Sequence, residues 1–213
     1  MASKAVRSAL ALAGVCAAVG LVALAAVRRA EPEAAVAAPP AAPPPAVSRI
    51  VEDGSRIRYE GAEHPTLTLP GGDHKIVSSV LKISRPMQFG DFVWDDKGVP
   101  EGPTWVRVDV ARQLISVFRG EHEIGSAVIL YGAESKPTPG GAFTVLQKAK
   151  DYHSRTYDAP MPFMLRLTDD GVAIHASNVR EGFATHGCIG IPREFARRLF
   201  AEARVGDAVF IQK

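Results

Sequence analysis

Apolar and polar side chains mostly alternate from residue 48 onward, which is the pattern of half-buried β-strands. In residues 104–110, three valines share one face, while Arg107 and Asp109 lie on the other. Glycine and proline separate such runs, as they do in the turns of β-rich proteins. The pattern predicts strands at residues 104–110, 113–119, 122–131, 142–147, 163–167, 171–175 and 207–212.

Two segments have helical rather than alternating periodicity. Residues 73–81 begin with an aspartate suited to an N-cap and repeat apolar side chains at helical spacing. Residues 192–203 begin with a proline, which suits the first turn of a helix. In a helix, one side of this segment would carry Phe195, Leu199 and Phe200. We therefore expect a mainly β domain, a sandwich or partial barrel, with one or two short helices.

The first 47 residues differ from this pattern. Lys4 and Arg7 precede twenty uncharged residues, 8–27, and a run of this length can span a hydrocarbon core. Residues 1–29 therefore predict an apolar helix that is either a signal peptide, cleaved near the small residues 23–25, or a membrane anchor. Residues 30–47 are rich in alanine and proline, and we expect a linker there. Both alternatives export the rest of the chain.

The charge distribution bears on the class of ligand. The formal net charge is +2, and residues 1–47 account for it with four basic and two acidic side chains. Residues 48–213 carry 21 basic and 21 acidic side chains. A neutral body without a basic stripe argues against nucleic acid as a partner. Small polar substrates and cell-wall polymers are compatible with it.

Cysteine and histidine provide the candidate chemistry. Cys16 lies in the apolar run, so it and Cys188 cannot form a disulfide framework. His175 ends a predicted strand, and the chain then loops back to Cys188. A histidine close to a thiol makes it a better nucleophile and can return the proton to the leaving group. We predict Cys188 as nucleophile and His175 as general base, with its second N–H donated to the backbone carbonyl of Ala176 or Ser177.

The turn around the cysteine permits two further interpretations. Gly187 lets the main chain approach a substrate carbonyl, so the amides of Gly187 and Cys188 could form an oxyanion hole. His186 either shapes this turn or only braces the loop. Zinc is an alternative with His175, His186 and Cys188 as ligands, although the His-Gly-Cys spacing suits a tetrahedron poorly and a fourth ligand is not evident.

These residues also carry a resemblance to a known family. THGCIGIP at residues 185–192, together with His175, resembles the signature of the L,D-transpeptidases, which have a YkuD-like catalytic domain. KPTPGGAFTV at residues 136–145 is similar to the family's Thr-Pro-x-Gly-x-Phe-x-Val stretch. The likeness implies a catalytic domain at residues 104–213. Residues 48–103 are similar, less closely, to an N-terminal extension of the catalytic unit.

The resemblance implies a YkuD-like β-sandwich that acts on peptidoglycan stem peptides without metal or organic cofactor. Cys188 would attack the carbonyl at the L-centre of the diamino acid, terminal D-alanine would leave, and a thioester would form with His175 as base. An amine of a second stem would then complete a cross-link. Water in its place would make the protein an L,D-carboxypeptidase. The expected compartment is the cell envelope, in the periplasm, with membrane attachment if the N-terminal segment is not cleaved.

The resemblance also implies roles for other positions. His186 and Gly187 would belong to the oxyanion turn, and Met161 and Phe163 lie in a segment that resembles the lining of the donor groove. The family usually has Arg or Asn at the position of Gly190, and Arg193 is our candidate to replace that brace. The absent side chain also leaves open a non-catalytic peptidoglycan-binding module. The sequence does not determine the oligomeric state.

Overall fold

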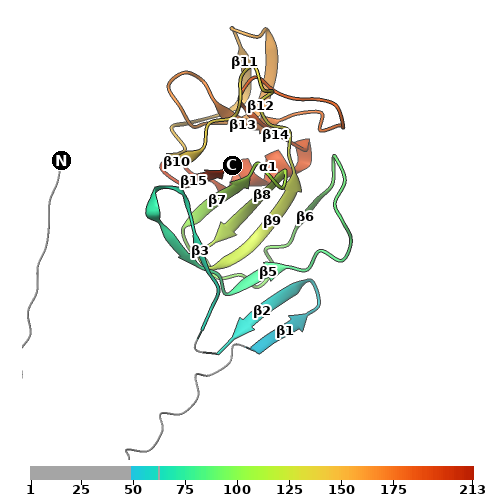
Figure 1. Ribbon diagram of the computed structural model, residues 1–213, viewed down its shortest axis with the longest axis vertical. Helices are drawn as coiled ribbons and strands as arrows, with labels where there is room; N and C mark the ends of the chain where they lie inside the picture. The colour runs from blue at the N-terminus through green and yellow to red at the C-terminus, as the bar shows by residue number, and fades with distance from the viewer. Residues whose placement is uncertain (1–48, 62) are drawn as a thin grey trace, which may run out of the picture. The chain divides into compact units, whose positions relative to one another are not determined.

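The computed structural model describes residues 49–61 and 63–213 (Figure 1). The apolar helix predicted at residues 1–29 and the linker predicted at residues 30–47 lie outside the described residues. Within the described part of the chain, no helix is both long and apolar enough to cross a membrane.

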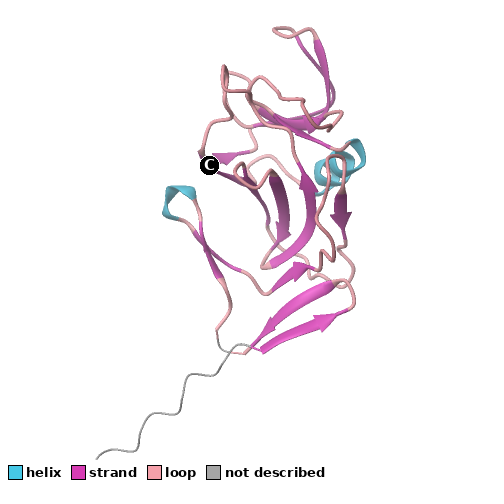
Figure 2. Ribbon diagram, turned by 45° about the vertical axis from the view of Figure 1, so that its right-hand side comes forward, coloured by secondary structure: helices cyan, strands magenta, loops and turns pink. Residues whose placement is uncertain are grey.

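Strands form most of the described structure, and they confirm the predicted mainly β fold. In these residues the larger sheet has nine strands, in the order β1 (Arg49–Asp53), β2 (Arg56–Glu60), β5 (Ser79–Leu81), β9 (His122–Val128), β8 (Leu114–Arg119), β7 (Thr104–Asp109), β15 (Ala208–Gln212) and β10 (Gly141–Thr144), with β6 (Phe92–Trp94) also paired to β9. The smaller sheet has the order β11 (Gln147–Ser154), β12 (Ala159–Arg166), β13 (Ala173–Ala176) and β14 (Ile189–Ile191). Hairpin β11–β12 projects beyond the other strands (Figures 1 and 2).

The main core lies between the two sheets and is closed by helix α1 (Arg193–Glu202), which packs against β12 and β13. Alternation along the strands supplies its side chains, because every second residue faces inward. Each fully buried aliphatic or aromatic side chain stabilises the fold by about 1.5–3 kcal/mol relative to an exposed one. Members from both sheets and the helix include Val108, Ile115, Ile124, Ile174, Ile189, Phe195, Leu199 and Ile211.

A second core covers the outer face of the larger sheet. Trp105 and Phe118 stack with their ring centroids 4.0 Å apart, and Phe210 packs against Trp105 edge to face. Leu69 and Val77 cover these rings from the hairpin of β3 (Thr66–Thr68) and β4 (His74–Ile76), which includes the 3-10 turn Pro70–Gly72. Strands from residues 49–103 therefore extend and cover the same sheet.

The helix predicted at residues 73–81 is wrong, since the segment forms β4 and β5. From Val77 to Leu81, every second residue is buried, which is the periodicity of a strand. β5 pairs with β2 and β9, and these long-range pairings determine the conformation in place of local helical spacing. The helix predicted at residues 192–203 is confirmed as α1, and it is the one α-helix in the described residues.

Each of the seven predicted strands overlaps a strand of the structure. The prediction did not include β1, β2, β3, β6, β11 and β14. β14 is only three residues long and lies within the glycine-rich signature, where alternation is too short to be recognised.

The C-terminal end of α1 is held to the larger sheet by an ion pair. Arg119 on β8 donates two hydrogen bonds to the Glu202 carboxylate, each 2.7 Å long, and Thr104 donates a third at 3.2 Å. The guanidinium lowers the pKa of Glu202, so the carboxylate stays charged at neutral pH. This pair holds the helix that directly follows β14, and with it the segment that carries Cys188.

Candidate active site

Strand β13 places the histidine. Ile174 points into the main core, while Ala173 and His175 face the other side of the smaller sheet, as the alternation predicted. β14 lies beside β13 in a parallel pairing that aligns Ile189 with Ile174. Cys188, immediately before β14, packs against Ala173. The thiol and the imidazole therefore lie on the same face of the sheet.

Both reactive groups open into one small cavity. It has a volume of about 160 Å³ and is lined by Ser154, Tyr157, Ala159, Met161, His175, Thr185, His186 and Cys188. A second cavity of about 440 Å³ contains Cys188 but not His175, and a third of about 690 Å³ contains His175 but not Cys188. The reactive pair thus lies where three cavities meet.

The hydrogen bonds of His175 determine which nitrogen is available. Nδ1 lies 2.9 Å from the carbonyl oxygen of Ala176, as the sequence suggested. A carbonyl can only accept, so in the neutral ring Nδ1–H donates this bond and Nε2 keeps its lone pair. Burial lowers the pKa of His175, and the bond to Ala176 opposes that effect in part. His175 is therefore a neutral base at pH 7.

The thiol of Cys188 is also neutral. Its Sγ donates to the carbonyl of Gly171 at 3.8 Å, and the backbone N–H of Ala173 is a donor to the sulfur. Burial raises the pKa of the thiol, while the nearby cation of Lys136 lowers it and Asp170 raises it. The resting site therefore holds a thiol and a neutral imidazole rather than an ion pair.

The turn before the cysteine is held by specific contacts. Gly187 has a φ of 103°, which favours glycine strongly. Thr185 Oγ1 donates to the carbonyl of Cys188 at 2.5 Å, and its backbone N–H donates to Tyr131 at 2.9 Å. Gly132 is tightly enclosed, because a Cβ there would lie 2.9 Å from Gly187 Cα. The signature thus fixes the turn against the chain that follows β9.

His186 is exposed and stacks on Tyr157 from the turn of hairpin β11–β12, with their ring centroids 4.6 Å apart. Lys136 Nζ donates to the Tyr157 hydroxyl at 2.7 Å. Neither Lys136 nor Tyr157 was predicted from the sequence as a site residue. Lys136 begins the KPTPGGAFTV stretch, which could have indicated it. Tyr157 lies in a hairpin turn without a recognisable motif.

The three predicted substrate-binding residues have different surroundings. Met161 is buried and lines two of the cavities that contain Cys188. Phe163, with a φ of 56°, packs against Phe200 on α1 instead and lines none of the three cavities that meet at the reactive pair. Arg193 lines the third cavity with His175, and its guanidinium lies 5.7 Å from the ring centroid of Phe163.

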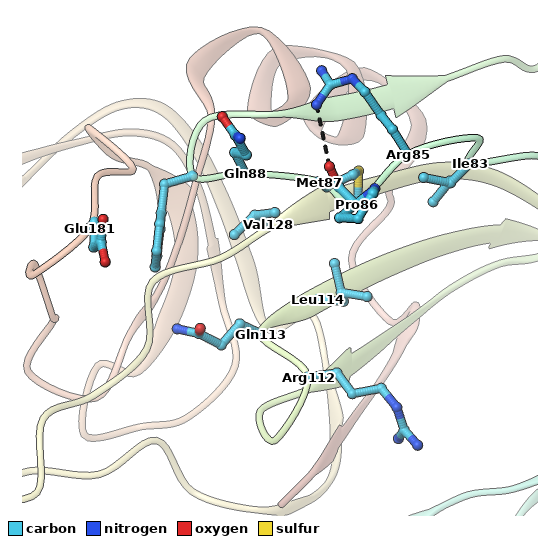
Figure 3. A pocket seen from close by; sticks show the side chains of 11 residues that line it. Ile83, Arg85, Pro86, Met87, Gln88, Arg112, Gln113, Leu114, Val128 and Glu181 are labelled. Carbon is cyan, nitrogen blue, oxygen red and sulfur yellow. Dashed lines mark hydrogen bonds between the residues drawn. The ribbon is translucent and has the colours of Figure 1, made fainter.

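Two other features do not add to this site. Among the described residues, no three His, Cys, Asp or Glu side chains are grouped as ligands for a metal ion. A cavity of about 760 Å³ lies beside β8 and β9 (Figure 3), and its lining includes Arg85, Gln88, Arg112 and Glu181. It contains neither cysteine nor histidine, so the candidate nucleophile and base lie elsewhere.

Solved structures of L,D-transpeptidases are similar to this chain. One from Stackebrandtia nassauensis is 20% identical, with a TM-score of 0.50 over 54% of this chain. One from Mycobacterium tuberculosis is 21% identical, with a TM-score of 0.48 over 52%. One from Enterococcus faecium is 23% identical, with a TM-score of 0.48 over 53%. This chain spans about half the length of each of these structures, namely 57%, 57% and 50% in the same order. At these identities the likeness concerns the fold. A search of curated proteins finds no match.

The sequence itself gives the stronger relationship. The family model of the L,D-transpeptidase catalytic domain, YkuD, matches residues 103–211, which are more than half of the 213 residues. This range contains both β13 and β14, with His175 and Cys188 at the cavity that they share. The chain therefore belongs to the L,D-transpeptidase family.

Proposed function

We propose that this protein is an exported cell-wall L,D-transpeptidase that joins peptidoglycan stem peptides through a thioester on Cys188. The observation that carries the proposal is the cavity shared by the Cys188 thiol and the His175 imidazole, whose Nε2 is left free as a base. Family membership supports the reaction class.

In the first half of the proposed reaction, His175 Nε2 takes the proton from the Cys188 thiol. The sulfur bonds to the carbonyl carbon at the L-centre of the diamino acid, and the carbonyl oxygen becomes negative. The backbone amides of Gly187 and Cys188 stabilise this oxygen. The C–N bond then breaks, the imidazolium gives its proton to the nitrogen of the departing D-alanine, and a thioester remains.

In the second half, the side-chain amine of another stem attacks the thioester. His175 accepts the amine proton as the new C–N bond forms, and the C–S bond breaks to restore the thiol. The cavity of about 440 Å³ at Cys188 and the cavity of about 690 Å³ at His175 offer separate room for a donor and an acceptor. This arrangement supports transfer to an amine over hydrolysis by water.

The proposed compartment is the cell envelope, where peptidoglycan lies outside the cytoplasmic membrane. The uncharged run at residues 8–27 supports export as either signal peptide or anchor.

Gly190 departs from the family pattern, and the structure suggests how this chain accommodates it. A Cβ at position 190 would lie 2.7 Å from Ser177 Oγ and 3.3 Å from Leu130 Cβ. Ser177 Oγ itself lies 3.4 Å from His175 Nδ1, beside the Ala176 carbonyl. The Ser177 side chain therefore fills the space that a larger residue at position 190 would need. We propose that Ser177 supports His175. Arg193 was our candidate to replace the brace that the family usually has at position 190.

The proposed function is tested directly by its products. Incubation of the protein with purified stem peptides should give dimeric stems in the mass spectrum, and Cys188→Ser should give none. Cys16→Ser should match the wild type, because Cys16 precedes the catalytic domain. Shortened monomers without dimers would identify a carboxypeptidase instead, and unchanged peptides would contradict catalysis.

The neutral thiol predicts how alkylation of Cys188 depends on pH. In a Cys16→Ser background, the iodoacetamide reaction should be slow at neutral pH and accelerate only at alkaline pH, because the raised pKa keeps the thiol protonated. An alkylation rate that already rises at acidic pH would show a preformed thiolate and contradict this description.

The lowered pKa of His175 should place the acid limb of kcat/KM below about pH 6.5.

The packing of Ser177 against Gly190 predicts a specific mutational pattern. Gly190→Ala should lower kcat/KM by about 10-fold or more, because its Cβ displaces the side chain beside His175. Combining it with Ser177→Gly removes the clash with Ser177 but also the proposed support, so the double variant should be no more active than Ser177→Gly alone. If Gly190→Ala retains full activity, Ser177 does not support the imidazole in the way we propose.

A further inference from the structure

Lys136 has a fixed position beside the reactive cysteine. Its backbone N–H donates to Ala133 at 2.9 Å, and Ala133 in turn donates to Thr185 at 3.0 Å. Gly132 fits beneath this turn, since a Cβ there would lie 2.2 Å from the Lys136 carbonyl oxygen. These contacts join the loop that carries Lys136 to the turn that carries Cys188.

The side chain of Lys136 lines the cavity of about 440 Å³ together with Cys188. Its ammonium donates to the hydroxyl of Tyr157 and lies 5.3 Å from that ring's centroid. In the described part of the chain, no carboxylate lies within ion-pair distance of Lys136. The same cavity is also lined by one arginine, two histidines and one acidic residue, which are Arg155, His153, His186 and Asp170.

This cavity is therefore suited to an anionic group held close to the thiol. Among the described residues, the ammonium of Lys136 has a hydrogen bond to a hydroxyl but no ion pair, so it can still bind a carboxylate through a charge-assisted hydrogen bond. Tyr157 would add a second hydrogen-bond donor at the same place. The bond to Tyr157 and the charge of Asp170 both raise the pKa of Lys136, so the cation persists through the neutral range.

The substrate of the proposed function, on which this inference rests, brings such an anion. The donor stem ends in a D-amino acid whose carboxylate lies one residue beyond the carbonyl that Cys188 attacks. We propose that Lys136 binds this terminal carboxylate and so selects stems with a free C-terminus as donors. Once the thioester forms, the carboxylate departs with the leaving residue. Lys136 therefore acts in acylation and not in the resolution of the thioester.

A purely structural role for Lys136 would have a different signature. Lys136, Tyr157 and His186 form a chain of contacts from the loop to the hairpin turn, so the loss of Lys136 could loosen that turn. Such loosening would slow every donor alike. Binding of the terminal carboxylate would slow only donors that carry it. A pair of donors that differ at this one group separates the two roles.

The test compares a stem tetrapeptide that ends in a free carboxylate with the same peptide as its C-terminal amide. For the wild-type full chain, kcat/KM for acylation should favour the acid by ~10- to 100-fold, the range of a hydrogen bond to a charged group. Lys136→Gln should bring this ratio close to one, while Lys136→Arg should restore most of it. Lys150→Gln, an exposed lysine on β11, is the matched control and should keep the wild-type ratio.

The outcomes distinguish this inference from the proposed function. If the wild type turns over both peptides equally, or if Lys136→Gln keeps the preference for the acid, the Lys136 assignment is overturned and the enzymatic function stands. Carboxylates elsewhere on the stem are common to both peptides. If Lys136 binds one of those instead, Lys136→Gln should lower both rates equally and leave their ratio unchanged. That result would also overturn the Lys136 assignment. If the wild type turns over neither peptide, both proposals fall.

Discussion

The parallel pairing of β13 with β14 is the constraint on which the site depends. It brings together two segments that are separated by a loop in the sequence and aligns Ile174 with Ile189, both buried in the main core. With these two side chains directed inward, the neighbouring positions must face outward, and His175 and Cys188 share one surface. A shift of one residue in either strand would bury one reactive group and separate it from the other. The apolar core thus determines the geometry of the chemistry.

Within that geometry, one hydrogen bond determines the role of the imidazole. The carbonyl of Ala176 holds the proton on Nδ1, which leaves the lone pair of Nε2 free for the proposed role as base. The half-buried site keeps both partners neutral at rest, because burial disfavours the charged form of each. In the proposed reaction, the thiol must therefore pass its proton to the imidazole before or during attack on the substrate. Lys136, placed in the same cavity as the thiol, is the nearby cation that favours negative charge on the sulfur.

Much of this arrangement could be predicted from local sequence. Alternation identified β7, β8, β9 and β15, since valine and isoleucine at every second position can only face a common core. His175 and Cys188 were predicted as a pair because a histidine at a strand end and a cysteine in the returning glycine turn can act together as base and nucleophile. Long-range features were not visible. Residues 73–81 have helical spacing, yet pairing with β2, β3 and β9 makes them strands. Phe163 turns toward α1 through a left-handed backbone conformation that alternation does not predict.

In our proposal, the Cys188 thiol, with His175 as its base, is the group that becomes acylated. Intact-mass measurement after incubation with a carbapenem tests this most directly. We expect one added carbapenem mass on the wild type and on Cys16→Ser, slower labelling of His175→Gln, and no addition to Cys188→Ser. Equal labelling of Cys188→Ser and wild type would contradict the claim, because the acyl group would then reside on another residue.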